Sequence, residues 1–182
     1  MRIENAFDVL APVEKAWRLL NDVPAVVPCM PGAELVEVVD ENAWTAKVHV
    51  KLGPIALQFL ADVTREHVDE AAHGAVLAVK AREAKGRGKA VATIESSLAP
   101  ATEGTHVTLV TELALHGAVA QYGRGVVADV ATRLTAQFAE CIAGKLGATP
   151  KQPAPEGAAA IGGLRIVLGA LWRSLFRRGD AR

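Results

Sequence analysis

The sequence predicts an α+β domain in which a curved antiparallel sheet of about seven strands wraps around a long C-terminal helix, with two short helices after the first strand. Three observations lead to this prediction. A short amphipathic helix lies near the N-terminus, segments of alternating apolar and polar residues follow it, and a proline-free stretch with helical periodicity comes last. A sheet that grips a long helix buries the apolar faces of both in one core.

The first short helix is predicted from the spacing of its apolar residues. Val13, Ala16, Trp17 and Leu20 follow the i, i+3, i+4, i+7 spacing that places side chains on one face of a helix. A second short helix is expected over residues 23–29, before a Pro-Gly pair turns the chain.

The strands are predicted from alternation, because successive residues of a strand point to opposite faces of the sheet. In Trp44–Lys51 the apolar residues occupy the even positions, and a similar alternation recurs over 57–64, 77–82 and 107–115. Consecutive strands of this kind predict an antiparallel meander with one polar face.

The long helix is predicted over residues 119–146, where one stripe is apolar. Near its start, Gly123 and Gly125 would each cost about 1 kcal/mol relative to alanine inside a helix. They indicate either a frayed helix start or close approach by a neighbour or ligand. The residues of the apolar stripe are Val127, Val130, Ala131, Leu134, Phe138 and Ile142.

Composition divides the chain into a domain at 1–146, a flexible linker at 147–160 and an amphipathic helix at 161–178. The linker contains three prolines and no large apolar residue, so it has nothing to pack. Residues 158–182 carry five arginines against one aspartate, which leaves 15 basic against 19 acidic residues in the rest of the chain. An acidic body and a basic, apolar tail are expected to face different surroundings.

The tail helix is expected to bind a membrane surface. Its length of about 24 Å falls short of the roughly 30 Å hydrocarbon core, and Arg165 near its middle would be costly inside it. A peripheral helix lying in the plane of the cytoplasmic face of the cell membrane is therefore favoured over docking on a partner or on the domain itself. The expected membrane contacts are Ile161, Leu164, Leu168, Leu171, Trp172, Arg173, Leu175, Phe176, Arg177 and Arg178.

Charge and cysteine content narrow the function classes. The formal net charge of zero gives no global reason to expect nucleic-acid binding. Cys29 and Cys141 have no nearby cysteine in the sequence, which predicts free buried thiols in a reducing compartment. The first residues lack the apolar run of an export signal, so a cytoplasmic protein is expected.

No motif assembles a catalytic or metal centre. The five histidines lack the spacing of a metal site, and Cys29 has no neighbouring base. The segment Gly86–Lys89 lacks the frame of a phosphate-binding loop and predicts a turn with basic side chains. A non-catalytic protein without a metal or covalent cofactor is expected.

The space between sheet and long helix is expected to hold a hydrophobic small molecule, because only eight aromatic residues are available to fill it. Tyr122 and Arg124 are candidate hydrogen-bond donors near its mouth, and Gly123 would allow close approach. The expected walls, any one of which alone is typical of ordinary core, are Trp44, Leu57, Phe59, Leu77, Val79, Leu113, Val127, Val130, Leu134 and Phe138.

Five short segments also occur in a known order and spacing: Pro12–Trp17, Cys29–Glu34, Lys51–Pro54, Gly86–Ala90 and Gly117–Gly125. In them the chain resembles the carbon monoxide dehydrogenase G-subunit family, a branch of the START-like, polyketide-cyclase-like helix-grip superfamily. The resemblance covers residues 1 to about 146, and the linker and hydrophobic tail follow in the expected place.

The resemblance implies a non-catalytic accessory protein that recruits a molybdenum-containing carbon monoxide dehydrogenase to the cytoplasmic membrane. It also implies a hydrophobic ligand between sheet and long helix. A redox partner and a membrane tail make a respiratory quinone, menaquinone or ubiquinone, the expected ligand. The alternatives are a ligand-free membrane adaptor for a molybdenum hydroxylase and a small START-like cyclase or hydrolase.

Overall fold

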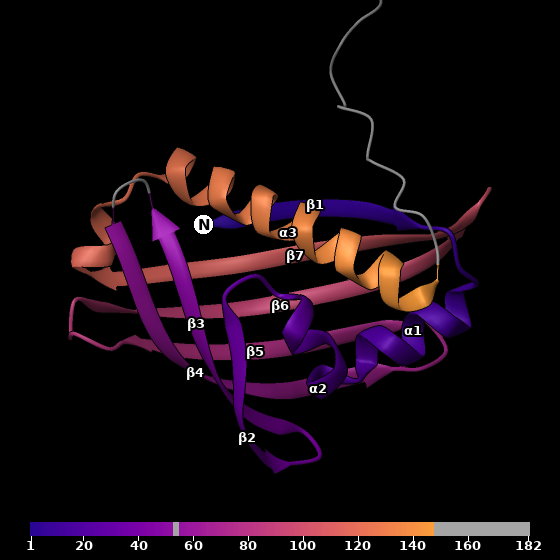
Figure 1. Ribbon diagram of the computed structural model, residues 1–182, viewed down its shortest axis with the longest axis horizontal. Helices are drawn as coiled ribbons and strands as arrows, with labels where there is room; N and C mark the ends of the chain where they lie inside the picture. The colour runs from indigo at the N-terminus through magenta and orange to yellow at the C-terminus, as the bar shows by residue number, and fades with distance from the viewer. Residues whose placement is uncertain (53–54, 148–182) are drawn as a thin grey trace, which may run out of the picture.

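The computed structural model describes residues 1–52 and 55–147, which form one sheet wrapped around a long helix (Figure 1). The predicted α+β helix-grip fold is confirmed, while the linker and tail predictions fall outside the described residues. The elements, with η for a 3₁₀ helix, are β1 (Arg2–Val9), α1 (Val13–Asn21), α2 (Val23–Val26), η1 (Val27–Cys29), β2 (Ala33–Asp40), β3 (Ala43–Leu52), β4 (Ile55–Asp69), β5 (Gly74–Glu83), β6 (Gly88–Ala101), β7 (Gly104–Gly117), η2 (Ala118–Gln121) and α3 (Arg124–Leu146).

The seven strands follow the order β1-β7-β6-β5-β4-β3-β2, and every neighbouring pair is antiparallel. Strands β2 to β7 form the predicted meander, and β1 pairs with β7 at the far edge. Helix α3 crosses the inner face of the sheet from η2 toward α1 (Figure 1). The inner faces of the strands and the buried stripe of α3 therefore enclose a common interior.

The two short helices form for the reasons their sequences suggest. In α1, Val13, Ala16 and Trp17 are buried on one face, as predicted. The second helical segment divides into α2 and η1, and the Asp22 carboxylate caps it by accepting a hydrogen bond from the Ala25 N–H over 3.1 Å.

Helix α3 begins five residues later than predicted, at Arg124, because residues 118–121 form η2 and Gly123 is the N-cap. No other part of the described chain approaches Gly123 or Gly125 closely, since a Cβ at either would meet nothing within 4 Å. Close approach occurs instead where β6 and β7 meet: a Cβ on Gly117, whose φ is 78°, would lie 2.9 Å from the Cα of Gly88.

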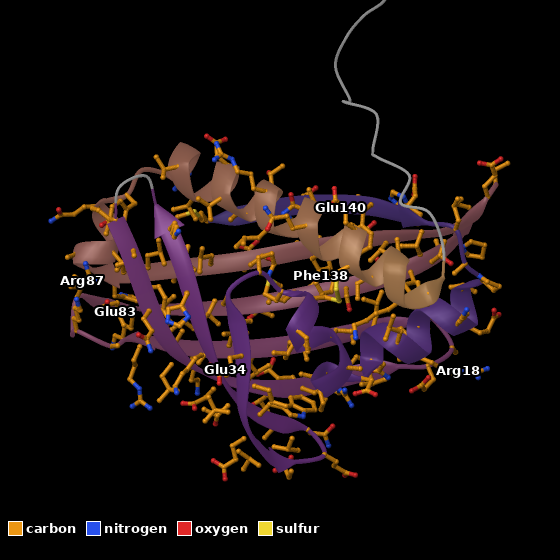
Figure 2. All side chains as sticks on the ribbon, in the orientation of Figure 1. Arg18, Glu34, Glu83, Arg87, Phe138 and Glu140 are labelled. Carbon is orange, nitrogen blue, oxygen red and sulfur yellow. A yellow bond between two sulfur atoms is a disulfide. The ribbon has the colours of Figure 1, made fainter. Side chains whose placement is uncertain are left out.

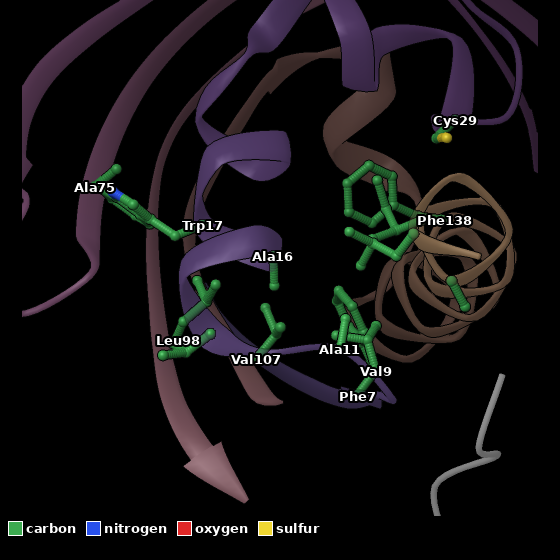
Figure 3. Close-up of a cluster of buried hydrophobic side chains, with 14 residues drawn as sticks. Phe7, Val9, Ala11, Ala16, Trp17, Cys29, Ala75, Leu98, Val107 and Phe138 are labelled. Atoms are coloured by element: carbon green, nitrogen blue, oxygen red, sulfur yellow. The ribbon is translucent and has the colours of Figure 1, made fainter. Parts of the chain in front are cut away.

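Large side chains fill the interior beneath the C-terminal half of α3. The rings of Phe7 and Phe138 meet edge to face with centroids 6.1 Å apart, and Trp17 and Leu98 are buried in the same cluster (Figure 3). We call this region the packed end, formed by α1, η1, β1, the C-terminal half of α3 and the facing residues of β5, β6 and β7.

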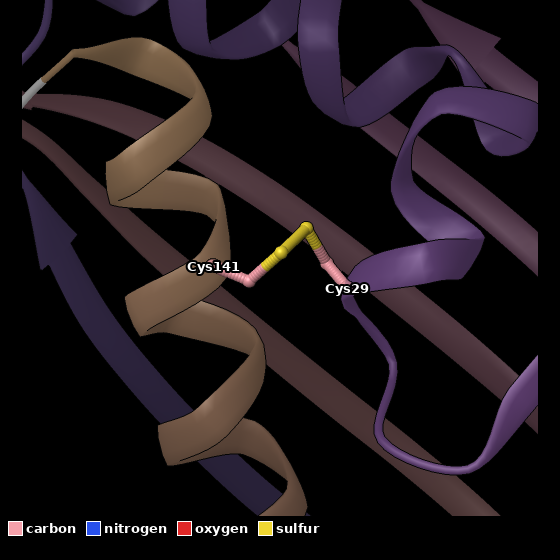
Figure 4. Close-up of a disulfide and its surroundings, with 2 residues drawn as sticks. All are labelled: Cys29 and Cys141. Atoms are coloured by element: carbon pink, nitrogen blue, oxygen red, sulfur yellow. A yellow bond between two sulfur atoms is a disulfide. The ribbon is translucent and has the colours of Figure 1, made fainter.

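The prediction of two free thiols is wrong, because Cys29 and Cys141 form a disulfide (Figure 4). The two residues are 112 positions apart in the sequence, but the packing of α3 on η1 brings their Cα atoms within 5.3 Å. Disulfides persist mainly in oxidising environments, so the cysteines give no support to a reducing compartment.

Candidate functional site

An apolar cavity of about 240 Å³ lies between the sheet and the N-terminal half of α3, and it is not sealed from solvent. We call this region the hollow end. All fourteen lining residues are apolar, and they come from β3 to β7, η2 and α3: Val48, Val50, Leu57, Phe59, Ala61, Val79, Ala81, Ala90, Ala92, Leu113, Leu115, Val119, Val127 and Val130.

Small side chains on neighbouring strands produce the cavity. Ala61, Ala81 and Ala90 are cross-strand partners on β4, β5 and β6, so they form a continuous row on the inner face of the sheet. From α3, only two valines, Val127 and Val130, line the same cavity. The space remains because the larger lining side chains, such as Phe59 and Leu113, lie around this row and no large side chain stands on it.

The size of the cavity limits what it can enclose. Dry apolar cavities of about 150 Å³ accept benzene, and most ligand pockets measure about 300–1,000 Å³. A volume of about 240 Å³ therefore suits a ring with a short substituent, and a longer molecule would have to extend through the opening.

Six of the ten predicted wall residues line the cavity: Leu57, Phe59, Val79, Leu113, Val127 and Val130. The other four do not. Phe138 packs against Phe7 at the packed end, and Trp44 is buried beneath the guanidinium of Arg65, which lies 5.0 Å from its ring centroid. Leu77 and Leu134 are half-buried outside the lining.

Sequence reasoning missed the small residues of the wall, although a signal was present. Ala61 and Ala81 continue the alternation that singled out Phe59 and Val79. Alanine was passed over because it contributes little to an apolar pattern. The remaining missed wall residues are Val48, Val50, Ala90, Ala92, Leu115 and Val119.

The predicted polar donors lie outside the cavity walls. Gly123 and Arg124 are exposed at the start of α3, and Tyr122 is half-buried. The pKa of Arg87 is raised, mainly by its hydrogen bond to Glu83 and to a smaller extent by Tyr122. Arg87 and Glu83 form an ion pair at this end of the molecule, in the turn whose basic side chains could also form a docking surface for an acidic partner.

The cavity walls can bind hydrocarbon but offer no acid, base or nucleophile, because none of the lining residues titrates. Burial of apolar ligand surface in such a cavity contributes roughly 25 cal/mol per Å² to the free energy of binding. Among residues 1–52 and 55–147, no group of three or more His, Cys, Asp or Glu side chains is placed to hold a metal ion.

The family model for CoxG, the carbon monoxide dehydrogenase G-subunit, matches residues 6–147, a range that contains both the packed end and the cavity. The chain belongs to the CoxG family. No curated protein shows significant sequence similarity to it. In the part of this CoxG family chain that the structure describes, no helix is long and apolar enough to cross a membrane.

Solved structures share the fold of this CoxG family chain. A conserved protein from Geobacillus kaustophilus superposes with a TM-score of 0.72 at 21% identity, covering 81% of this chain and 95% of that one. Protein Ms6760 from Mycobacterium smegmatis gives 0.59 at 18% identity, covering 80% and 90%. The Zhui aromatase/cyclase from Streptomyces sp. R1128 gives 0.56 at 15% identity, covering 81% and 93%. At these identities the likeness shows the fold alone.

Proposed function

We propose that this CoxG family protein is a non-catalytic accessory protein that recruits a molybdenum-containing carbon monoxide dehydrogenase to the cytoplasmic membrane. We further propose that it carries a respiratory quinone, menaquinone or ubiquinone, which links the enzyme to the respiratory chain. The observation that carries the proposal is a cavity with exclusively apolar walls in a chain of this family.

The cavity fits the hydrocarbon part of a quinone. A ring and its nearest substituents match about 240 Å³, and the remainder of an isoprenoid chain would leave through the opening. Each buried methylene stabilises the complex by about 0.8 kcal/mol. The carbonyl groups need hydrogen-bond donors, which must come from residues beside the fourteen that line the walls.

Transport is favoured over catalysis by the chemistry of the walls. An aromatase/cyclase shares the fold at 15% identity, but the lining residues here provide no group to move a proton or attack a carbonyl. The alternative function, a START-like cyclase or hydrolase, is tested by assaying the purified protein for turnover, and we expect none.

The identity of the ligand is tested by organic extraction of the purified full-length protein followed by mass spectrometry. We expect a quinone to co-purify. Ala92→Leu, which projects into the cavity between Val79 and Leu113, is expected to weaken rebinding of added menaquinone. Ala114→Leu makes the same change at an exposed position of β7 and should not. Protein that is empty and does not rebind quinone would favour the ligand-free adaptor.

Membrane recruitment is tested separately by deleting residues 148–182, which removes the basic, apolar segment and leaves the helix cap at Gly147. We expect the full-length protein to sediment with anionic vesicles and the truncated protein to stay in the supernatant. A truncated protein that still sediments would show that this segment does not bind the protein to the membrane. The family match supports the cytoplasmic side of this proposal, and the cysteines, which form a disulfide, do not.

A further inference from the structure

A carboxylate lies on the inner face of the sheet at the end of the cavity. On β5 the residues that line the cavity are Val79 and Ala81, and the next residue on the same face is Glu83. Its cross-strand partner is Phe59, which also lines the cavity. The side chain of Glu83 is 0% exposed. A charge buried in this way needs a partner.

Arg87 is that partner, and it reaches Glu83 from the turn between β5 and β6 (Figure 2). Its Nη2 donates to Glu83 Oε1 over 2.8 Å, while the backbone N–H groups of Lys85 and Arg87 donate to Oε2 over 2.8 and 3.1 Å. The guanidinium hydrogen bond, with help from these backbone donors, lowers the pKa of Glu83 to about 2 against the opposing effect of burial. The pair is therefore ionised on both sides and neutral overall.

Arg87 also joins the elements that surround this end of the cavity. Nη2 donates to the carbonyl oxygen of Ala56 over 3.1 Å, and the Arg87 carbonyl oxygen accepts from the N–H of Val119 over 3.3 Å. Val119 and Leu57, the neighbour of Ala56, both line the cavity. The Nε of Arg87 is buried and donates to no atom in the described part of the chain. A buried donor without an acceptor is costly, so a ligand oxygen that displaced the neighbouring side chains and reached it from the cavity would be stabilised.

We propose that the guanidinium of Arg87, positioned by Glu83, is the hydrogen-bond donor for a carbonyl oxygen of the bound ligand. The inference rests on the proposed function, because it names the polar end of the molecule that the cavity carries. The apolar walls enclose the hydrocarbon part, and the carbonyl points toward the turn between β5 and β6.

The ion pair selects a neutral acceptor over an anion. Because Glu83 already balances the charge of Arg87, the carboxylate of a fatty acid would bring an unpaired negative charge into an apolar site. A ketone or quinone carbonyl needs only the uncommitted donor. The ligand class is therefore an apolar ketone or quinone. Decanoate is expected to bind at least about tenfold more weakly than 2-undecanone, and equal affinities would overturn this selectivity.

We call the hydrogen bond from Arg87 to the ligand carbonyl the anchor. It is tested on the full-length protein by titration calorimetry with two probes of the same ring system, 2-methyl-1,4-naphthoquinone and 2-methylnaphthalene. Glu83→Met/Arg87→Met removes both charges and the donor but retains apolar bulk. Its matched control, Asp62→Met/Arg82→Met, removes an exposed ion pair of 3.5 Å from the outer face of the same sheet. We expect the first variant to bind the naphthoquinone at least about tenfold more weakly and methylnaphthalene within about twofold of wild type. The control should change neither affinity.

The outcomes separate the anchor from the carrier function. If the double variant loses affinity for both probes by the same factor, or for neither, the anchor is overturned. The Glu83–Arg87 pair would then serve only to stabilise the turn. Wild-type protein that binds both probes equally would also overturn it, while the carrier function would stand. Wild-type protein that binds neither probe would overturn the carrier function itself.

A second measurement covers the case in which the double variant does not fold. Arg87→Lys retains a charge beside Glu83 but loses the planar set of donors. In the wild type, the carbonyl stretching band of bound naphthoquinone should move to lower wavenumber than in hexane, and in the lysine variant the shift should shrink. An unshifted band in the wild type would overturn the proposal.

Discussion

The packed end and the hollow end share one helix and one sheet but differ in the size of the side chains between them. At the packed end, Phe7 and Phe138 fill the space under α3, and Trp17 is buried against His73 on the other side of α1 (Figure 3). At the hollow end, a row of alanines and two valines of α3 line a cavity of about 240 Å³. The comparison shows that residue size, and not a break in the backbone architecture, creates the cavity.

Stability is expected to follow the same division. At the packed end, Ile142 and Val107 are fully buried, and the disulfide ties α3 to η1. At the hollow end, Val130 and Leu113 are only half-buried, and side chains that face a void forgo contacts on that side. We infer that the packed end holds the fold together, so that the hollow end can remain available for a ligand.

The largest expected difference comes from the same substitution at both ends. Leu98→Ala at the packed end should lower the free energy of unfolding by about 2–5 kcal/mol, because it leaves a new void in a close-packed cluster. Leu113→Ala in the cavity wall should cost clearly less, since its side chain already borders a void. Urea unfolding of both variants measures the difference, and equal losses would show that the two ends are packed equally tightly.

The disulfide provides the next largest effect. Cys29→Ala/Cys141→Ala should lower the free energy of unfolding by about 2–4 kcal/mol, because the bond closes a long loop in the unfolded chain. Thermal unfolding with and without reductant checks this, and reduced wild type should match the variant. Because the bond lies at the packed end, ligand affinity at the hollow end should change little. A reductant that leaves the wild-type transition unmoved would contradict the prediction.

Local patterns were enough to predict which faces of the elements point inward. The alternation in β4 placed Leu57 and Phe59 on the cavity side, and helical spacing placed Val13, Ala16 and Trp17 in the core. These predictions succeed because side-chain direction in a strand or helix depends only on the neighbouring residues.

The features that the sequence did not predict depend mainly on contacts between distant segments. Pairing of Cys29 with Cys141 requires α3 to dock on η1, which no local pattern reveals. Glu83 did leave a signal, since it is a carboxylate in the apolar register of β5, but its partner Arg87 could be assigned only once the turn was seen. The start of α3 was misplaced because residues 118–121 have helical spacing yet form a 3₁₀ turn.

The smallest expected effect is an acid sensitivity confined to the hollow end. The pKa of Glu83 is about 2 in the folded protein and near 4.5 without its partners. Between these values the unfolded chain binds the extra proton, so the stability from this group is complete above about pH 4.5 and is lost as the pH falls toward about 2. The amide resonances of Lys85 and Arg87, which donate to Glu83, should titrate near pH 2 in NMR spectra, and Glu83→Gln should abolish that step. If both amides titrate near pH 4.5, Arg87 does not hold the carboxylate, and neither the ion pair nor the anchor built on it can stand.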